Sequence, residues 1–352
     1  MFFHQRRMRV TSLVLLWCLV SLTACVAHSW RTPAMTAGVP QDVVIYSGRT
    51  EALIMPVIQA FRNEYPHINV ILKSGKNNEL AAAILEERAQ PQADIFLSTD
   101  MLTHINLSAD DVFVAEPIAG TEHIPAHLKD AAGRWTSVTS RARVIMYNTS
   151  LVSATDAPTS MFDLTHPRWY GKVAIADSSN GPMQAQVASM IALVGEAATR
   201  TWLDGLVANN ATFFASATDL RKAVGSGEFA IGVANHYHYL LQQQETTNNT
   251  VAAIYPDQAD GQIGVMMNTS TVARIAGAPH PDAARIFAEY LFRPDIQMLF
   301  ATVNMEFAVI PEVARAPHSV DLRTLRIAAV DMQQAATGAP QAVKLMQSVG
   351  IP

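Results

Sequence analysis

The chain has 352 residues, which is longer than one hydrophobic core usually extends, so two domains or two lobes are expected. Its formal net charge of −5 argues against nucleic-acid binding, which depends on neutralising phosphates with basic side chains. The two cysteines, Cys18 and Cys25, both lie near the N-terminus. The rest of the chain therefore has no thiol for a disulfide, a cysteine zinc site or a cysteine nucleophile.

The first 25 residues have the pattern of an export signal. Three arginines precede an apolar run from Val10 to Leu22, which ends in Leu22-Thr23-Ala24-Cys25. This ending resembles a bacterial lipobox, in which the cysteine is lipidated; the alternative is a plain secretory signal, which also ends in small residues. We expect a lipoprotein signal peptide over 1–25 with Cys25 as the lipidation site, and a flexible tether over 26–40. The protein would then be extracytoplasmic and anchored to a bacterial membrane by its lipid. No later apolar run approaches the ~18 residues of a membrane span.

From residue 41 onward, strands and helices alternate. The expected strands cover residues 43–46, 68–72 and 93–97, and the expected helices cover residues 51–65 and 78–89. This alternation predicts a mostly parallel sheet flanked by helices. Because parallel strands end at one edge of a sheet, the polar segments after them are expected to face a ligand together. These segments are 47–50, 74–76 and 98–100.

A second unit of the same kind begins near Trp135. Its expected strands cover residues 144–147, 173–176 and 229–234, and its expected helices cover residues 184–194, 197–207 and 218–224. A strand pair over 264–276 and helices over 282–292 and 295–303 follow. The loops lack the spacing of phosphate-binding glycine motifs and of a nucleophile elbow, so we do not expect an enzyme.

Four polar aromatic residues follow Asn235 at the end of the strand at 229–234, and they are His236, Tyr237, His238 and Tyr239. At the carboxyl end of a strand, such rings suit a metal ion or a bound anion. The alternative is the start of an amphipathic helix whose rings pack against a neighbour. Adjacent Tyr237 and His238 can reach one ion from a strand-to-helix turn, whereas His236 and His238 cannot once a helix starts.

Two arginines, Arg141 and Arg143, precede the strand at 144–147. They are either partners in surface ion pairs or a clamp for an anion, because the planar guanidinium matches carbonate and phosphate oxygens.

Several segments resemble the ferric-iron-binding branch of the bacterial solute-binding proteins of ABC transporters (family 1 extracellular solute-binding). They are Val44–Glu51, Gln92–Ser98, Ser140–Asn148, Gly227–Tyr237 and Glu306–Pro311, and the likeness spans roughly residues 42 to 315. The resemblance implies an α/β type II periplasmic-binding-protein fold, with two lobes that close about a hinge. Each lobe would be a mostly parallel sheet flanked by helices. The expected division is lobe 1 over 41–140 and 265–318, lobe 2 over 141–264, and a C-terminal helical segment over 319–352.

The resemblance also implies a ligand shell. In this branch two adjacent tyrosines follow the strand that here ends at Asn235; Tyr237 matches the first, and His238 replaces the second. Tyr239 is a further metal candidate, with His236 a lesser one. Some members carry a histidine, a glutamate or a tyrosine at three positions that are here Thr50, Thr99 and Pro182.

A synergistic anion such as carbonate is implied next to Arg141 or Arg143. The residues implied to hold this anion or to face the ligand are Arg49, Thr50, Thr99, Asp100, Arg141, Arg143, Ser179, Asn180, Gly181 and Asn235.

The implied function is to bind ferric iron as cargo, together with carbonate or phosphate, and to deliver it to the permease and ATPase subunits of an ABC importer. We expect no organic cofactor. We expect the protein to be a monomer. One alternative keeps the fold and binds an organic anion, such as a phosphonate, a phosphate ester or a thiamine-like solute. Two others are a sensor subunit that presents its ligand to a membrane kinase, and an extracytoplasmic hydrolase that uses His238 with Asp100.

Overall fold

The structure is a computed structural model, and it describes residues 40–310, 313–315 and 319–352. The predicted signal peptide with Cys25 and nearly all of the predicted tether lie outside the described residues.

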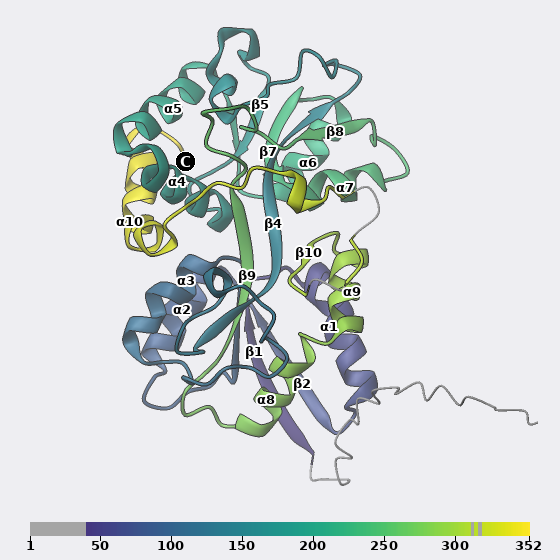
Figure 1. Cartoon of the computed structure of the whole chain (residues 1–352), viewed down its shortest axis with the longest axis vertical. Coiled ribbons are helices and arrows are strands. Elements are labelled where there is room, and N and C mark those ends of the chain that lie inside the picture. The colour runs from purple at the N-terminus through teal and green to yellow at the C-terminus, as the bar shows by residue number, and fades with distance from the viewer. Residues whose placement is uncertain (1–39, 311–312, 316–318) are drawn as a thin grey trace, which may run out of the picture. The chain divides into compact units, whose positions relative to one another are not determined.

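A parallel three-stranded sheet with helices on its faces forms the base of what we call lobe 1 (Figure 1). Its elements in chain order are β1 (Gln41–Ser47), α1 (Glu51–Glu64), β2 (Ile68–Ser74), α2 (Asn77–Glu86), β3 (Ile95–Ser98) and α3 (Met101–Leu107). Helix α1 buries Ile54, Val57, Ile58 and Phe61, whose spacing of three and four residues gives the helix one apolar face. Two later helices, α8 (Pro281–Tyr290) and α9 (Pro294–Val303), add Phe287 and other side chains to the same core.

One long strand, β4 (Trp135–Asn148), belongs to both lobes. Its first part, up to Ala142, pairs antiparallel with β9 (Met267–Arg274) and with the short strand β10 (Phe307–Ala308). β9 in turn pairs with β3, so this part of β4 extends the sheet of lobe 1. From Arg143 onward β4 pairs with strands of the second lobe.

The second part of β4 extends a sheet that we call, with the helices around it, lobe 2. Strands β7 (Ile231–Asn235) and β8 (Val251–Ile254) pair antiparallel with β4, and β5 (Val173–Ala176) pairs in parallel with β7 and with β6 (Thr212–Phe214). The helices of this lobe are α4 (Gly181–Val194), α5 (Glu196–Ala208), α6 (Ala217–Ser226) and α7 (His236–Gln243). Short 3₁₀ turns elsewhere cover Ser108–Asp110, Ala126–Leu128, Met161–Thr165, Pro167–Trp169 and Leu322–Thr324.

The last helix, α10 (Met332–Ser348), packs against α4 and α5 of lobe 2 and also against α3 of lobe 1. Figure 1 shows it in yellow beside α4 and above α3. Helix α10 lies within the segment 319–352, whose assignment as a separate C-terminal segment stays a prediction. The predicted division into lobes at particular residues stays a prediction.

Some predicted elements differ in the structure. The strand expected at 144–147 is the end of the much longer β4, and the strand pair expected at 264–276 is the single strand β9. Helix α3 and the short strands β6 and β8 were not predicted. Both long strands carry Ser, Thr and Arg side chains that are typical of loops, but most of those side chains are buried here.

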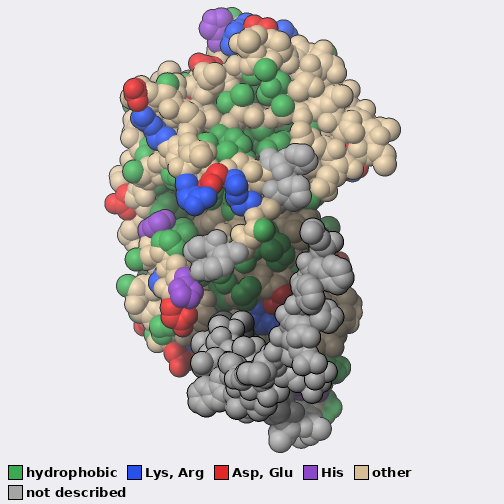
Figure 2. Space-filling model, turned by 45° about the vertical axis from the view of Figure 1, so that its right-hand side comes forward, with side chains coloured by type: hydrophobic (Ala, Val, Ile, Leu, Met, Phe, Trp, Pro, Cys, Tyr) green, Lys and Arg blue, Asp and Glu red, His purple; other side chains and the backbone are tan. Residues whose placement is uncertain are grey.

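Figure 2 shows one face of the molecule, on which basic and acidic side chains lie interspersed. In the described part of the chain, no helix combines the length and the apolar character that crossing a membrane requires.

Candidate functional site

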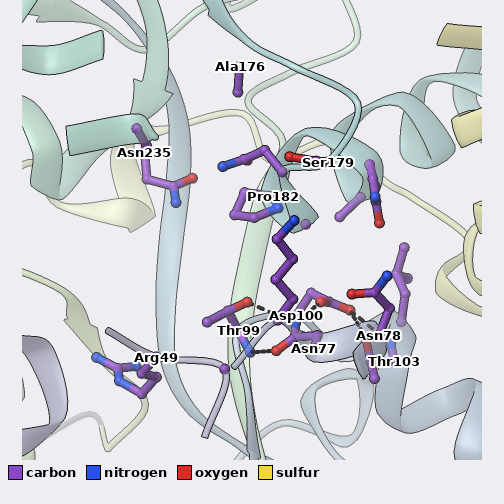
Figure 3. Close-up of a pocket in the computed structure, with 18 of the residues that line it drawn as sticks. Arg49, Asn77, Asn78, Thr99, Asp100, Thr103, Ala176, Ser179, Pro182 and Asn235 are labelled. Atoms are coloured by element: carbon purple, nitrogen blue, oxygen red, sulfur yellow. Dashed lines mark hydrogen bonds between the residues drawn. The ribbon is translucent and has the colours of Figure 1, made fainter. Parts of the chain in front are cut away.

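A cavity of about 1050 Å³ lies where strand ends of the two lobes face each other. Strands β1 and β3 of lobe 1 and strands β5 and β7 of lobe 2 each lead into a loop or helix start that lines it. Figure 3 shows Asn235, Ser179 and Pro182 on one side and Arg49, Thr99 and Asn77 on the other. This is the position at which open α/β sheets bind ligands, because polar loop groups and helix N-termini gather there.

Tyr237 and His238 enter this cavity from the first turn of α7. The helix starts directly after β7, so the end of the strand fixes the backbone positions of both residues. Their ring centroids lie 4.1 Å apart with a tilt of 32°, and both side chains are buried. The prediction that adjacent Tyr237 and His238 can face one ligand is consistent with this arrangement.

The two flanking rings do not line the cavity. His236 stacks on Phe307 with centroids 4.0 Å apart, and its Nδ1 accepts the backbone N–H of Ala142 at 3.3 Å. Tyr239 packs in a hydrophobic cluster with Tyr255 beside it. Tyr239 does not line the cavity, because two helical residues rotate it by about 200° from Tyr237, and its role as a metal ligand stays a prediction.

Arg143 reaches the cavity from β4 and is held from two sides. Its Nε donates to Oε1 of Gln186 at 2.9 Å, and its Nη1 donates to Oδ1 of Asn235 at 3.1 Å. The remaining nitrogen, Nη2, and Nδ2 of Asn235 are buried without a hydrogen-bond partner among the described residues. Two buried donors of this kind are costly unless a ligand accepts from them.

Arg141, two residues earlier on β4, belongs to a second group of buried charges. Its Nη2 donates to the carbonyl of Thr99 and, at 3.0 Å, to Oγ of Ser270. The same Ser270 oxygen accepts from Arg49 at 2.7 Å, and Arg49 donates to Oε2 of Glu306 at 2.7 Å. Oε1 of Glu306 lies 3.8 Å from Nε of Arg141. The arginines are therefore buried parts of the site, and the alternative of surface ion pairs for Arg141 and Arg143 is wrong.

Asn77 organises the wall of the cavity in lobe 1. Its Nδ2 donates to Oγ1 of Thr99 at 2.8 Å and to Oδ2 of Asp100, while its Oδ1 accepts the N–H of Thr99 at 3.2 Å. Asp100 also caps α3, because its Oδ1 accepts the N–H of Thr103 at 2.8 Å. Gly48 allows this packing, since a Cβ there would lie 1.8 Å from Oδ1 of Asn77.

The wall in lobe 2 is the loop from β5 into α4. Asn180 caps the helix by accepting the N–H of Met183 at 3.1 Å, and Oγ of Ser179 donates to Asp177. Gly181 begins the helix close to lobe 1: a methyl group placed on it would lie 3.8 Å from Oδ2 of Asp100. The space between the lobes here would therefore hold about one methyl group.

Burial governs the ionisation of these side chains. Loss of water raises the pKa of Tyr237, although Arg141 and Arg49 act in the opposite direction. Burial lowers the pKa of His238 to about 3, helped by Arg143, so the imidazole is neutral near pH 7. Burial also lowers the pKa of Arg143 to about 10, which leaves it a cation. Three arginines against Glu306 and Asp100 leave an excess of positive charge that favours an anionic ligand.

The structure brings together along this cavity all of the residues that the sequence suggested for anion or ligand binding, and their roles stay predictions. Sequence reasoning missed Asn77, Ser270 and Glu306. Among the described residues, no three of the His, Cys, Asp and Glu side chains converge as a metal site.

Comparisons with known proteins identify the family of the chain. Residues 90–329 match the family described as bacterial extracellular solute-binding protein. The chain is 31% identical over 301 residues to iron uptake protein A2 of Synechocystis, covering 83% of this chain and 86% of that protein. The ferric binding protein of Campylobacter jejuni has a similar structure, with a TM-score of 0.81 and 25% identity, over 88% of this chain and all of the other.

A protein of Trichodesmium whose structure was determined with iron and citrate ligands is similar as well. Its TM-score is 0.74 at 27% identity, over 88% of this chain and all of that one. These likenesses cover both lobes, and the fold is the α/β periplasmic-binding-protein fold that the sequence suggested. The chain belongs to the bacterial extracellular solute-binding protein family, in its ferric-iron-binding branch.

Proposed function

We propose that this solute-binding protein carries ferric iron to an ABC importer. The observation that supports this most is the pair Tyr237 and His238, which enter one cavity side by side from the first turn of α7. The proposal includes the permease and ATPase of the importer as partners, lipid attachment at Cys25, and a monomeric protein outside the cytoplasm.

The chemistry of the pair suits this cargo. Fe(III) is a hard cation that favours anionic oxygen, and a phenolate supplies it. Because burial raises the pKa of Tyr237, the phenol keeps its proton in the empty site and loses it to solvent only when a metal binds the oxygen. His238 is already neutral, so its imidazole can bind without losing a proton first.

One phenolate and one imidazole do not fill the coordination sphere of Fe(III), and the hydroxyl groups of Thr50 and Thr99 in the cavity wall supply no charge. An anion held by the protein completes the shell in this proposal. Nη2 of Arg143 and Nδ2 of Asn235 are the donors available for it. Carbonate and phosphate both have oxygens at the spacing that a guanidinium recognises.

The test is a titration of the chain from Val26 onward with ferric citrate, with and without carbonate, recorded as a visible spectrum. We expect a charge-transfer band from phenolate to iron that is lost in Tyr237→Phe. Tyr239→Phe is the matched control and should keep the band, because Tyr239 does not line the cavity. Absence of the band in the unmodified chain at every carbonate concentration would contradict iron binding.

A second candidate cargo is an organic anion in the same cavity. The observation that favours it is size, because about 1050 Å³ is the volume of a cavity for a small organic molecule and far exceeds a metal ion. Thermal stabilisation of the iron-free chain by a phosphonate or a phosphate ester, lost in Arg143→Ala, would support this cargo.

The hydrolase alternative gains no support from the geometry. The carboxyl group of Asp100 is held by Asn77 and Thr103, and Nδ1 of His238 has no hydrogen-bond partner among the described residues. No acid–base pair is formed by these two side chains.

A further inference from the structure

Helix α10 touches both lobes at the edge of the cavity. Its buried residues Ala336 and Leu345 belong to the core of lobe 2, and Leu102 of α3 is part of the same hydrophobic cluster. Its residues Ala339 and Val343 line the cavity. The helix is thus a side wall of the ligand site as well as a contact between lobes.

A proline inside α10 changes what its backbone can do. Pro340 has no N–H, so it cannot donate to the carbonyl of Ala336, four residues earlier, as an ordinary helical residue would. Ala336 is fully buried. A buried carbonyl that loses its helical donor needs another partner.

That partner comes from the other lobe. Nδ2 of Asn106, on α3, donates to the carbonyl of Ala336 at 3.0 Å. Asn106 is an exposed residue, so burial does not force its side chain to find a hydrogen-bond partner within the protein. Asn106 and Pro340 both line the cavity, which places this bond beside the ligand.

We propose that α10 is a latch between the lobes: Asn106 of lobe 1 binds the carbonyl that Pro340 leaves open in α10 of lobe 2, and this bond slows the opening of the cavity. Lobe opening requires α3 and α10 to separate, which breaks the bond and exposes the apolar contact around Leu102. Near Gly181, by comparison, even an added Cβ would meet Asp100 only at van der Waals distance, 3.8 Å from its Oδ2.

The experiment uses the chain from Val26 onward without ligand, so its outcome does not depend on the identity of the cargo. We would measure the radius of gyration by small-angle X-ray scattering and the hydrogen exchange of the α10 backbone. Asn106→Ala should increase the radius of gyration and accelerate exchange in α10 by about five-fold, the effect of one hydrogen bond. Asn63→Ala is the matched control: Asn63 is an exposed asparagine on α1 of the same lobe, bonded only to Gln59 among the described residues.

A double-mutant cycle with Pro340→Ala tests the role of the proline. The alanine restores the helical N–H, so the carbonyl of Ala336 no longer depends on Asn106. Asn106→Ala should then change exchange much less in the Pro340→Ala background than in the unmodified chain. The latch is refuted if Asn106→Ala behaves like Asn63→Ala in both measurements. Equal effects of Asn106→Ala in the two backgrounds would overturn the part assigned to Pro340.

Discussion

Burial lowers the pKa of three histidines in this protein, His104, His236 and His238, but their side chains make different contacts. His238 faces the cavity, whereas His236, two residues earlier, is fixed between Phe307 and the backbone of Ala142. His104 is a third case. Its Nδ1 lies 2.6 Å from Oγ1 of Thr271, and its ring lies between Phe96 and Phe113 at 4.8 and 5.1 Å.

We predict that His104 makes the fold sensitive to acid. Burial lowers its pKa from 6.5 to about 3, so below pH 6.5 the unfolded chain takes up a proton that the folded chain does not. The free energy of unfolding therefore decreases as the pH is lowered. The contribution of this residue is a loss of roughly 2 to 3 kcal/mol between pH 6.5 and 4.5. In His104→Asn this contribution is absent. Urea unfolding at the two pH values measures it.

The control for this prediction is His123→Asn, which changes an exposed histidine of the same lobe. It should keep the acid sensitivity of the unmodified chain. A slope in His104→Asn equal to that of the control would mean that His104 does not titrate in the way its burial implies.

At the scale of elements, the start of α4 limits how closely the lobes approach. We predict that Gly181→Ala preserves ligand binding, because the added methyl group would meet Asp100, Asn77 and Thr99 at 3.8 to 3.9 Å, an ordinary contact distance. Gly181→Leu should weaken binding by about ten-fold or more, since overpacking costs roughly 1 to 3 kcal/mol. Titration with ferric citrate measures both. Unchanged affinity in Gly181→Leu would show that the lobes do not need this approach.

The elements that could be predicted are those whose side chains carry a clear period. Helix α1 and strands β1, β2 and β3 agree with the sequence to within a few residues, because each has apolar residues at regular spacing. The first part of β4 was missed because Thr136, Ser137 and Thr139 are polar, although they pair with the distant strand β9 and are buried. The sequence around a residue does not show which distant segments of the chain will bury it.

The candidate site divides in the same way. Tyr237 and His238 could be found because they follow one strand directly in the sequence. Glu306 and Ser270 could not, since they reach Arg49 from 257 and 221 residues away. Nor could sequence alone show that Tyr239 turns away from the cavity, because that depends on where the helix begins.

At the scale of the whole described structure, the two lobes are joined by a strand that belongs to both of their sheets. All residues of β4 are buried, and the strand passes from one sheet into the other without a break. Helix α10 adds a second connection. We therefore predict that heating the ligand-free chain gives one calorimetric transition whose measured enthalpy equals the van't Hoff enthalpy. Two resolved peaks, or a measured enthalpy well above the van't Hoff value, would show that the lobes unfold separately.

The different fixation of His236 and His238 bears on how the site can evolve. Position 236 fastens α7 to β4 and to the segment that carries Glu306, so a change there disturbs the fold. Position 238 lies on the same helix turn, but Nδ1 of its imidazole bonds to none of the described residues. A replacement of similar size at 238 therefore removes no hydrogen bond of Nδ1, and we expect it to disturb the fold less than a replacement at 236. Selection can exchange this side chain to alter cargo preference while the scaffold that presents it stays the same.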